Sequence, residues 1–136
     1  MVSKMKQIAI KENHLYNKTF RRGKSFVGKY TAIYVLRDLS AERLKKENPR
    51  KKYVNRVGLS VSKKIGGAVE RNRAKRIIRA AFDVYEDRLS KGNLIVISAR
   101  TSIVGKKSQD IAREFAFAFE KLSLLRQENK NEEKQK

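Results

Sequence analysis

Hydrophobic residues recur three and four positions apart in three stretches of the chain, and each stretch predicts a helix with one apolar side. The first helix is predicted over residues 14–22, because Asn13 can cap its start and Gly23 is well placed just past its end. The second follows a Gly-Gly pair, and Ser108 can cap the third. The apolar residues of the second and third helices are Ala74, Ile78, Ala81, Phe82, Tyr85 and Leu89, and Ile111, Phe115, Ala118, Phe119, Leu122 and Leu125.

Stretches between these helices have the patterns of strands. Residues 26–37 are predicted to be extended, with a turn near Gly28, and residues 94–97 form a continuous apolar run typical of an interior strand. Residues 53–62 form a strand whose large side chains point one way, so that its small residues leave a low surface where a ligand can approach the sheet closely. The large residues are Val57, Leu59 and Val61, and the small ones are Gly58, Ser60 and Ser62.

The order of these elements is helix, strands, helix, strand, helix, which predicts an α+β fold. We expect a two-layer sandwich in which one mostly antiparallel sheet of about four strands carries the helices on one face. The chain order is then α-β-β-β-α-β-α. A strand, helix and parallel strand in succession ordinarily form a right-handed crossover.

At 136 residues, the length favours a single domain, which we place at residues 1–126. Residues 1–10 are expected to form a short, partly flexible arm, and residues 127–136 a disordered charged tail with nothing to bury. Residues 38–52 form a long charged connection with a possible turn of helix over residues 41–46.

Charge narrows the classes of partner. Lysine and arginine number 34 against 14 acidic residues, a net charge of +20, which favours a polyanion as partner. An anionic membrane is the less favoured polyanion, because no apolar run approaches the ~18 residues of a spanning helix. The chain has no cysteine and its first residues contain no long apolar segment, so we expect a cytoplasmic protein without disulfides or a zinc–thiolate site.

The densest charge lies on the second helix, within residues 62–81. A helical winding of 100° per residue places most of its cations opposite the apolar side, with Lys75 on the flank, whereas Arg71 lies above the apolar stripe in the first turn. Five cations fall within nine positions, and they are Arg71, Arg73, Lys75, Arg76 and Arg79.

Such a cluster is unfavourable without an anion, because like charges repel one another and cations in a first turn oppose the helix dipole. Only Glu70 interrupts the run before Asp83, and we expect the acids after the run to pair with arginines or to be solvated. The alternative is a merely solvated basic face. A polyphosphate chain removes both penalties, so we interpret this element as a nucleic-acid-binding helix.

Residues for independent catalysis are not evident. The only histidine, His14, falls in the first turn of a helix, where it is expected to be a surface residue. No pair of carboxylates or histidines with the pattern of a nuclease site stands out, and residues 63–67 lack the spacing of a nucleotide phosphate-binding loop. We therefore predict no catalytic residue and no metal ligand.

The stretch over residues 56–76, RVGLSVSKKIGGAVERNRAKR, resembles the signature of the bacterial ribonuclease P protein subunit. That family is known for an Arg-Asn-Arg core followed by further basic residues, and here the core is Arg71-Asn72-Arg73. The preceding strand, lysine pair and glycine turn match as well. The resemblance implies a left-handed crossover, contrary to the ordinary rule, in a fold shared with a ribosomal protein domain.

The resemblance also implies a function. Ribonuclease P removes the 5′ leader of precursor tRNA, and in bacteria the catalytic centre, with its Mg²⁺, belongs to an RNA subunit. The protein is then a non-catalytic subunit, and it binds that RNA and the single-stranded leader. No cofactor would be held tightly by the protein, which would be a monomer in a complex of one protein and one RNA.

Two surfaces of this chain match those that the family uses. The residues that match the basic motif are Lys63, Lys64, Arg71, Asn72, Arg73, Lys75, Arg76 and Arg79. The residues that match the leader cleft, between the first helix and the sheet, are Tyr16, Phe20, Tyr34 and Ser60. The family often has phenylalanine where Tyr16 stands, and tyrosine keeps the stacking surface. On the sequence alone, Tyr16 and Phe20 could equally fill the core.

Two other classes of function fit parts of the sequence. A ribosomal or other structural RNA-binding protein is compatible with the charge and the fold. A protein-only nuclease would need a cluster of acidic residues, which the sequence does not contain in a recognisable pattern.

Overall fold

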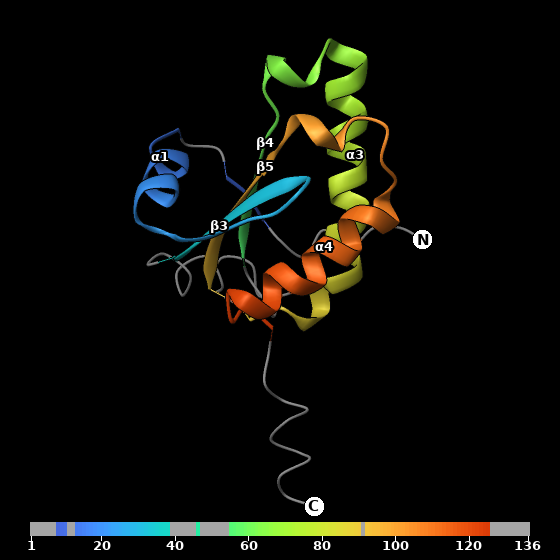
Figure 1. Cartoon of the computed structure of the whole chain (residues 1–136). Coiled ribbons are helices and arrows are strands. Elements are labelled where there is room, and N and C mark those ends of the chain that lie inside the picture. Colours follow the sequence, from blue (N-terminus) through green and yellow to red (C-terminus); the bar gives the residue numbers. More distant parts are fainter. Residues whose placement is uncertain (1–7, 11–12, 39–45, 47–54, 91, 126–136) are drawn as a thin grey trace, which may run out of the picture.

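The computed structural model describes residues 8–10, 13–38, 46, 55–90 and 92–125 (Figure 1). The helices are α1 (Asn13–Arg22), α3 (Ala68–Tyr85) and α4 (Ser108–Lys121). The strands are β1 (Ile8–Ala9), β2 (Lys24–Val27), β3 (Thr31–Arg37), β4 (Arg56–Ser60) and β5 (Asn93–Ala99). Single turns of 3₁₀ helix are η1 (Lys63–Ile65), η2 (Glu86–Arg88) and η3 (Thr101–Ile103).

The strands form one sheet in the order β1-β4-β5-β3-β2. β5 lies in its middle, parallel to β4 on one side and antiparallel to β3 on the other, and β2 pairs antiparallel with β3. α3 carries the chain from β4 to β5 along one face of the sheet, in a left-handed crossover (Figure 1). The α+β class and the left-handed connection that the resemblance implied are thus confirmed.

The N-terminal end adds a strand that the sequence did not predict. Ile8 and Ala9 pair in parallel with Arg56 and Val57 of β4, and the next residue, Ile10, is buried. The end of the predicted arm is therefore part of the sheet. Residues 1–7 of the arm, the tail over residues 127–136 and most of the connection over residues 38–52 lie outside the described residues.

Helices cover both faces of the sheet, so the prediction of helices on one face is wrong for α1 (Figure 1). α3 and α4 pack on the face to which Ile95 and Ile97 of β5 point. α1 packs on the opposite face, against Leu94 and Val96. The reason lies in β5 itself, because a strand that is apolar on both sides needs cover on both.

Element boundaries follow the predictions closely. α1 ends before Gly23, and a turn at residues 28–30 separates β2 from β3. β4 ends at Ser60, two residues earlier than predicted. The N-cap of α4 is Lys107 rather than Ser108, and the Asp110 carboxylate accepts a hydrogen bond of 3.0 Å from the Lys107 backbone N–H.

A buried ion pair fixes the start of β4. Arg56 donates from Nε and Nη2 to the two carboxylate oxygens of Asp38, at 2.8 and 2.9 Å, and both residues are buried. Next to it, Asn55 donates to the Ser90 carbonyl and accepts from the Asn93 backbone N–H, at 3.0 and 2.9 Å. These contacts join the end of β3 to the starts of β4 and β5.

Candidate nucleic-acid interface

A tight turn brings the lysine pair to the start of α3. The Ser62 hydroxyl accepts a hydrogen bond from the Lys64 backbone N–H at 3.3 Å, and Gly66 has a φ of 143°, which disfavours any residue with a side chain. Glu70 reaches back from α3, and its carboxylate accepts from the Gly67 N–H at 3.0 Å. Lys63 and Lys64 are both exposed on this turn.

α3 has the two sides that the helical winding predicts. Its buried residues are Ala74, Ile78, Ala81 and Phe82. The exposed members of the basic motif on this helix are Asn72, Arg73, Arg76 and Arg79. Lys75 on the flank is half-buried, and so is Arg71, whose Nε donates to the Gly67 carbonyl at 3.4 Å. Arg71 thus packs against the first turn and does not enter the core.

The cations of α3 are not neutralised by the described acids of the protein. Glu70, the one acid within the run, uses its carboxylate to cap the helix. Asp83, which was expected to pair with an arginine or to be solvated, is exposed and forms no ion pair within the described residues. Between described residues, ion pairs join Arg56 to Asp38 and Arg113 to Asp110, and neither involves α3. The helix therefore presents a row of like charges that an external anion would stabilise.

The predicted cleft residues come together on the other face of the sheet, beneath α1. Gly58, Val96 and Tyr34 lie side by side in one row across β4, β5 and β3. Phe20 of α1 meets Tyr34 in this row, with ring centroids 4.8 Å apart and planes at 79°. Ser60 lies one row further along, beside Ser98, and is half-buried.

Tyr16 occupies the surface that the sequence assigned to a ligand. A Cβ at Gly58 would collide with the phenol ring of Tyr16, so this glycine makes room for a side chain of the protein itself. The prediction of an open surface is wrong at this position. Burial raises the pKa of the Tyr16 phenol, and a hydrogen bond with the Leu59 backbone partly offsets that effect.

The aromatic side chains of the cleft are only partly covered. Phe20 is 37% exposed, and Tyr16 and Tyr34 are half-buried. Rings in this state retain faces or edges on which a base can stack. The sequence left open whether Tyr16 and Phe20 fill the core or line the cleft. The exposure of Phe20 argues against a position in the core.

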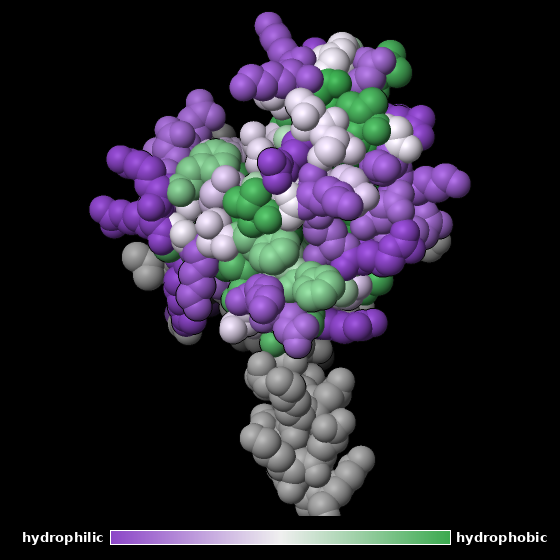
Figure 2. Space-filling view, in the orientation of Figure 1, coloured by the Kyte–Doolittle hydropathy of each residue, from purple (hydrophilic) through white to green (hydrophobic). Residues whose placement is uncertain are grey.

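Hydrophilic and apolar residues are unevenly distributed over the surface of the protein. Hydrophilic side chains gather over α1 and toward α3 and α4, with a strip of apolar and near-neutral residues between them (Figure 2). His14 is exposed, as predicted. Within the described residues, no three histidine, cysteine or acidic side chains are grouped as metal ligands would be, and no helix is long and apolar enough to cross a membrane.

The sequence did not predict one further cluster, at the turn between β2 and β3. Lys106, from the loop before α4, lies over the Tyr30 ring with its Nζ 5.6 Å from the centroid. Glu114 of α4 binds the backbone of the same turn. Only the tertiary fold brings these distant residues together. In the sequence, Tyr30 is one of several apolar residues in a predicted strand.

Comparison with known proteins agrees with this geometry. The chain is similar to the ribonuclease P protein components of Clostridium acetobutylicum, with 35% identity over 93% of this chain and 98% of the relative, and of Listeria welshimeri, with 34% identity over 93% and 97%. The fold is similar to that of the Staphylococcus aureus RNase P protein, with a TM-score of 0.68 at 24% identity, covering 87% of this chain and 97% of that one. For the Thermotoga maritima RNase P protein the TM-score is 0.51 at 26% identity, over 72% and 74%. The family model Ribonuclease P matches residues 5–123, so the chain belongs to the ribonuclease P protein family.

Proposed function

We propose that this chain is the protein subunit of a bacterial-type ribonuclease P, which acts in the cytoplasm on precursor tRNA. It binds the catalytic RNA subunit through α3 and the single-stranded 5′ leader through the cleft beneath α1. The subunit is a monomer in a complex of one protein and one RNA. Cleavage of the leader then yields the mature 5′ end of the tRNA.

One observation carries the proposal: Arg73, Arg76 and Arg79 of α3 are exposed and form no ion pair with a described residue. Arginine forks match the spacing of phosphate oxygens, and the dense charge of an RNA backbone relieves their mutual repulsion. The exposed lysine pair before α3 extends the same surface. A helix of this kind supports docking on a folded RNA rather than on a neutral partner.

The cleft suits a leader of varied sequence. Tyr34 and Phe20 present partly exposed rings, and stacking on any base contributes about 1–3 kcal/mol per base without sequence preference. Ser60 and Ser98 are small neighbours one row away, which leave the sheet surface low where a strand of nucleotides would pass. Of the small residues that the sequence assigned to a low surface, Gly58 is covered by Tyr16, and Ser60 supports the proposed path of the leader.

The protein contributes binding, and the chemistry belongs to the RNA. The described residues do not group into a set of oxygen ligands that would fit Mg²⁺, so we assign the catalytic Mg²⁺ to the RNA subunit and no catalytic residue to this chain. Basic side chains near the RNA lower the repulsion between phosphates. We therefore expect the protein to reduce the Mg²⁺ concentration that cleavage requires.

A single assay tests the proposal. Precursor tRNA is incubated at low Mg²⁺ with this protein, with a bacterial ribonuclease P RNA, or with both. Rapid cleavage at the mature 5′ end only when both are present supports the proposal. Cleavage by the protein alone would select a protein-only nuclease, and binding to ribosomal RNA without stimulation would select a structural RNA-binding protein.

A further inference from the structure

The turn between β2 and β3 is held rigidly by α4. The Glu114 carboxylate accepts hydrogen bonds from the backbone N–H groups of Lys29, Tyr30 and Thr31, at 2.6, 3.0 and 2.8 Å, and from the Thr31 hydroxyl at 2.6 Å. Gly28 is required beside it, because a Cβ there would collide with the same carboxylate. A carboxylate that caps three successive N–H groups fixes the turn far more firmly than an ordinary surface hairpin.

The segment after β5 fixes the other side of the turn. The Arg100 backbone N–H donates to the Tyr30 carbonyl at 2.9 Å, and the Arg100 guanidinium donates to the Gly28 carbonyl at 2.5 Å. The Ser102 hydroxyl donates to the Lys29 carbonyl. Glu114, Arg100 and Ser102 thus hold the backbone of the turn in place from two sides.

Tyr30 lies at the centre of a group of cations. Its ring has the Lys29 Nζ at 6.0 Å and the Lys106 Nζ at 5.6 Å from the centroid, within the range of cation–π contacts. Tyr30 is half-buried, and its hydroxyl makes no hydrogen bond within the described residues. Lysines and an aromatic ring in one place are the combination that binds phosphates and stacks bases.

Two acids, Asp110 and Glu114, lie beside this group. Asp110 forms an ion pair with Arg113 at 2.6 Å and accepts from the Lys107 N–H at 3.0 Å. Glu114 is occupied by the turn. The Lys107 backbone hydrogen bond, and after it the charges of Arg113 and Lys106, lower the pKa of Asp110. Lys29 and Arg100 are exposed and form no ion pair with a described residue, so the two acids offset the positive charge of the cluster only in part.

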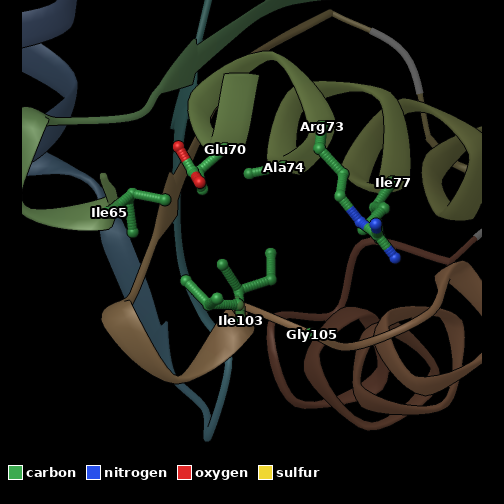
Figure 3. Close-up of a pocket in the computed structure, with 8 residues that line it drawn as sticks. Ile65, Glu70, Arg73, Ala74, Ile77, Ile103 and Gly105 are labelled. Carbon is green, nitrogen blue, oxygen red and sulfur yellow. The ribbon is translucent and has the colours of Figure 1, made fainter. Parts of the chain in front are cut away.

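The cluster continues the basic surface of α3. Arg73 lines a small hollow with Val104 and Gly105, the two residues before Lys106 (Figure 3). The Arg73 side chain points away from Glu70, which lies on the side of Ile65. The loop over residues 104–107 therefore connects the first turns of α3 to the Tyr30 cluster. Glu70 is the one acid among the residues that line this hollow, and its carboxylate caps α3.

We propose that Lys29, Arg100 and Lys106, held around the Tyr30 ring, form a second contact surface for the RNA subunit of ribonuclease P. The inference rests on the proposed function. Tyr30 packs against the core shared by α3 and α4, which lies on the face of the sheet opposite the leader cleft. The RNA that α3 binds, and not the leader, is thus the partner that this surface meets.

The test compares two double variants that lose the same charge. Lys29→Ala with Lys106→Ala removes the cations over Tyr30. Lys24→Ala with Lys121→Ala removes two exposed lysines elsewhere, one at the start of β2 and one at the end of α4. Dissociation constants for ribonuclease P RNA are measured over a range of salt concentrations. Loss of two phosphate contacts reduces the slope of log affinity against log salt by about 1.4–1.8, whereas the matched control leaves it close to wild type.

Each outcome decides the inference. Equal slopes for the two double variants would overturn it, and so would a loss of discrimination between precursor and mature tRNA in the Tyr30 cluster variant. Lys106→Gln keeps most of the buried stem and removes the charge, so it repeats the test with less effect on folding. Failure of the wild-type protein to bind or stimulate the RNA would instead refute the proposed function.

Discussion

Two helices carry aromatic pairs at the same spacing, yet the fold gives them opposite surroundings. Tyr16 and Phe20 lie on α1, and Phe115 and Phe119 lie on α4, each pair four residues apart. Phe115 and Phe119 are completely buried, whereas Phe20 is 37% exposed and Tyr16 is half-buried. The two helices cover opposite faces of one sheet.

Cover by a second helix accounts for the difference. Phe119 lies against the rings of Phe82 and Tyr85 on α3, with centroids 6.1 and 5.6 Å apart, so two helices close that face. α1 has no partner among the described helices on its own face, where the buried cluster contains Ile10, Leu94 and Val96. One face of the sheet therefore buries the aromatic pair of α4 completely, and the other leaves aromatic surface of the α1 pair exposed to solvent.

The largest expected effect contrasts the two aromatic pairs directly. Phe119→Ala removes a completely buried ring and should reduce the free energy of unfolding by about 3–5 kcal/mol. Phe20→Ala, at a partly exposed position, should reduce it by less than about 1 kcal/mol. Urea unfolding followed by circular dichroism measures both values. Similar losses for the two variants would contradict the division of roles between the faces.

A smaller effect is expected at the Glu114 carboxylate, which joins α4 to the β2–β3 turn. Glu114→Gln replaces an acceptor with an amide whose NH₂ group faces N–H donors, which should cost about 1–3 kcal/mol of unfolding free energy. Glu120→Gln, at an exposed position of the same helix, serves as the control and should be near neutral. Chemical denaturation of both variants measures the difference. Equal stabilities would mean that the turn does not depend on the charge of Glu114.

The sequence predicted what local periodicity determines. The apolar side of α3, with Ile78 and Phe82 buried, follows from spacing alone, as does the helix end at Gly23. The sequence could not predict which face α1 covers. The apolar residues of β5 indicate that both faces of the sheet are covered, but they do not indicate which helix covers which face. Placement of helices is a property of the whole topology.

The contacts that the sequence missed all join distant segments. Gly58 looked like a place for a ligand, and its actual neighbour is Tyr16 from another element. Glu114 binds the backbone of a turn more than eighty residues away in the chain, a contact that local spacing does not indicate. Arg56 is one basic residue of a basic stretch, and only its burial beside Asp38 distinguishes it from the exposed arginines.

Leader binding should respond to the cleft face alone. Tyr34→Ala removes the ring that meets Phe20 and should weaken binding of precursor tRNA to the holoenzyme by about 1–3 kcal/mol, or roughly five- to 150-fold. Affinity for mature tRNA, which has no leader, should stay almost unchanged. Tyr34→Phe keeps the ring and should bind like wild type. Equal losses for precursor and mature tRNA would remove the leader from this cleft.

The smallest effect on stability is expected for the exposed arginines of α3. Arg76 is exposed on α3, so Arg76→Ala should change the free energy of unfolding by less than about 0.5 kcal/mol. It should still weaken binding to the catalytic RNA and reduce the salt slope by about 0.7–0.9, the share of one phosphate contact. A thermal melt followed by circular dichroism and a salt titration of RNA affinity separate the two quantities.

Arg56 serves as the comparison for Arg76, because its guanidinium is buried against Asp38. Arg56→Ala removes the buried guanidinium that binds both carboxylate oxygens of Asp38 and should destabilise the fold by about 3–5 kcal/mol. The two arginines should thus show opposite profiles, one in RNA affinity and one in unfolding. If Arg76→Ala lowered stability as much as Arg56→Ala, the α3 cations would be part of the scaffold, and their exposure would no longer argue for a phosphate partner.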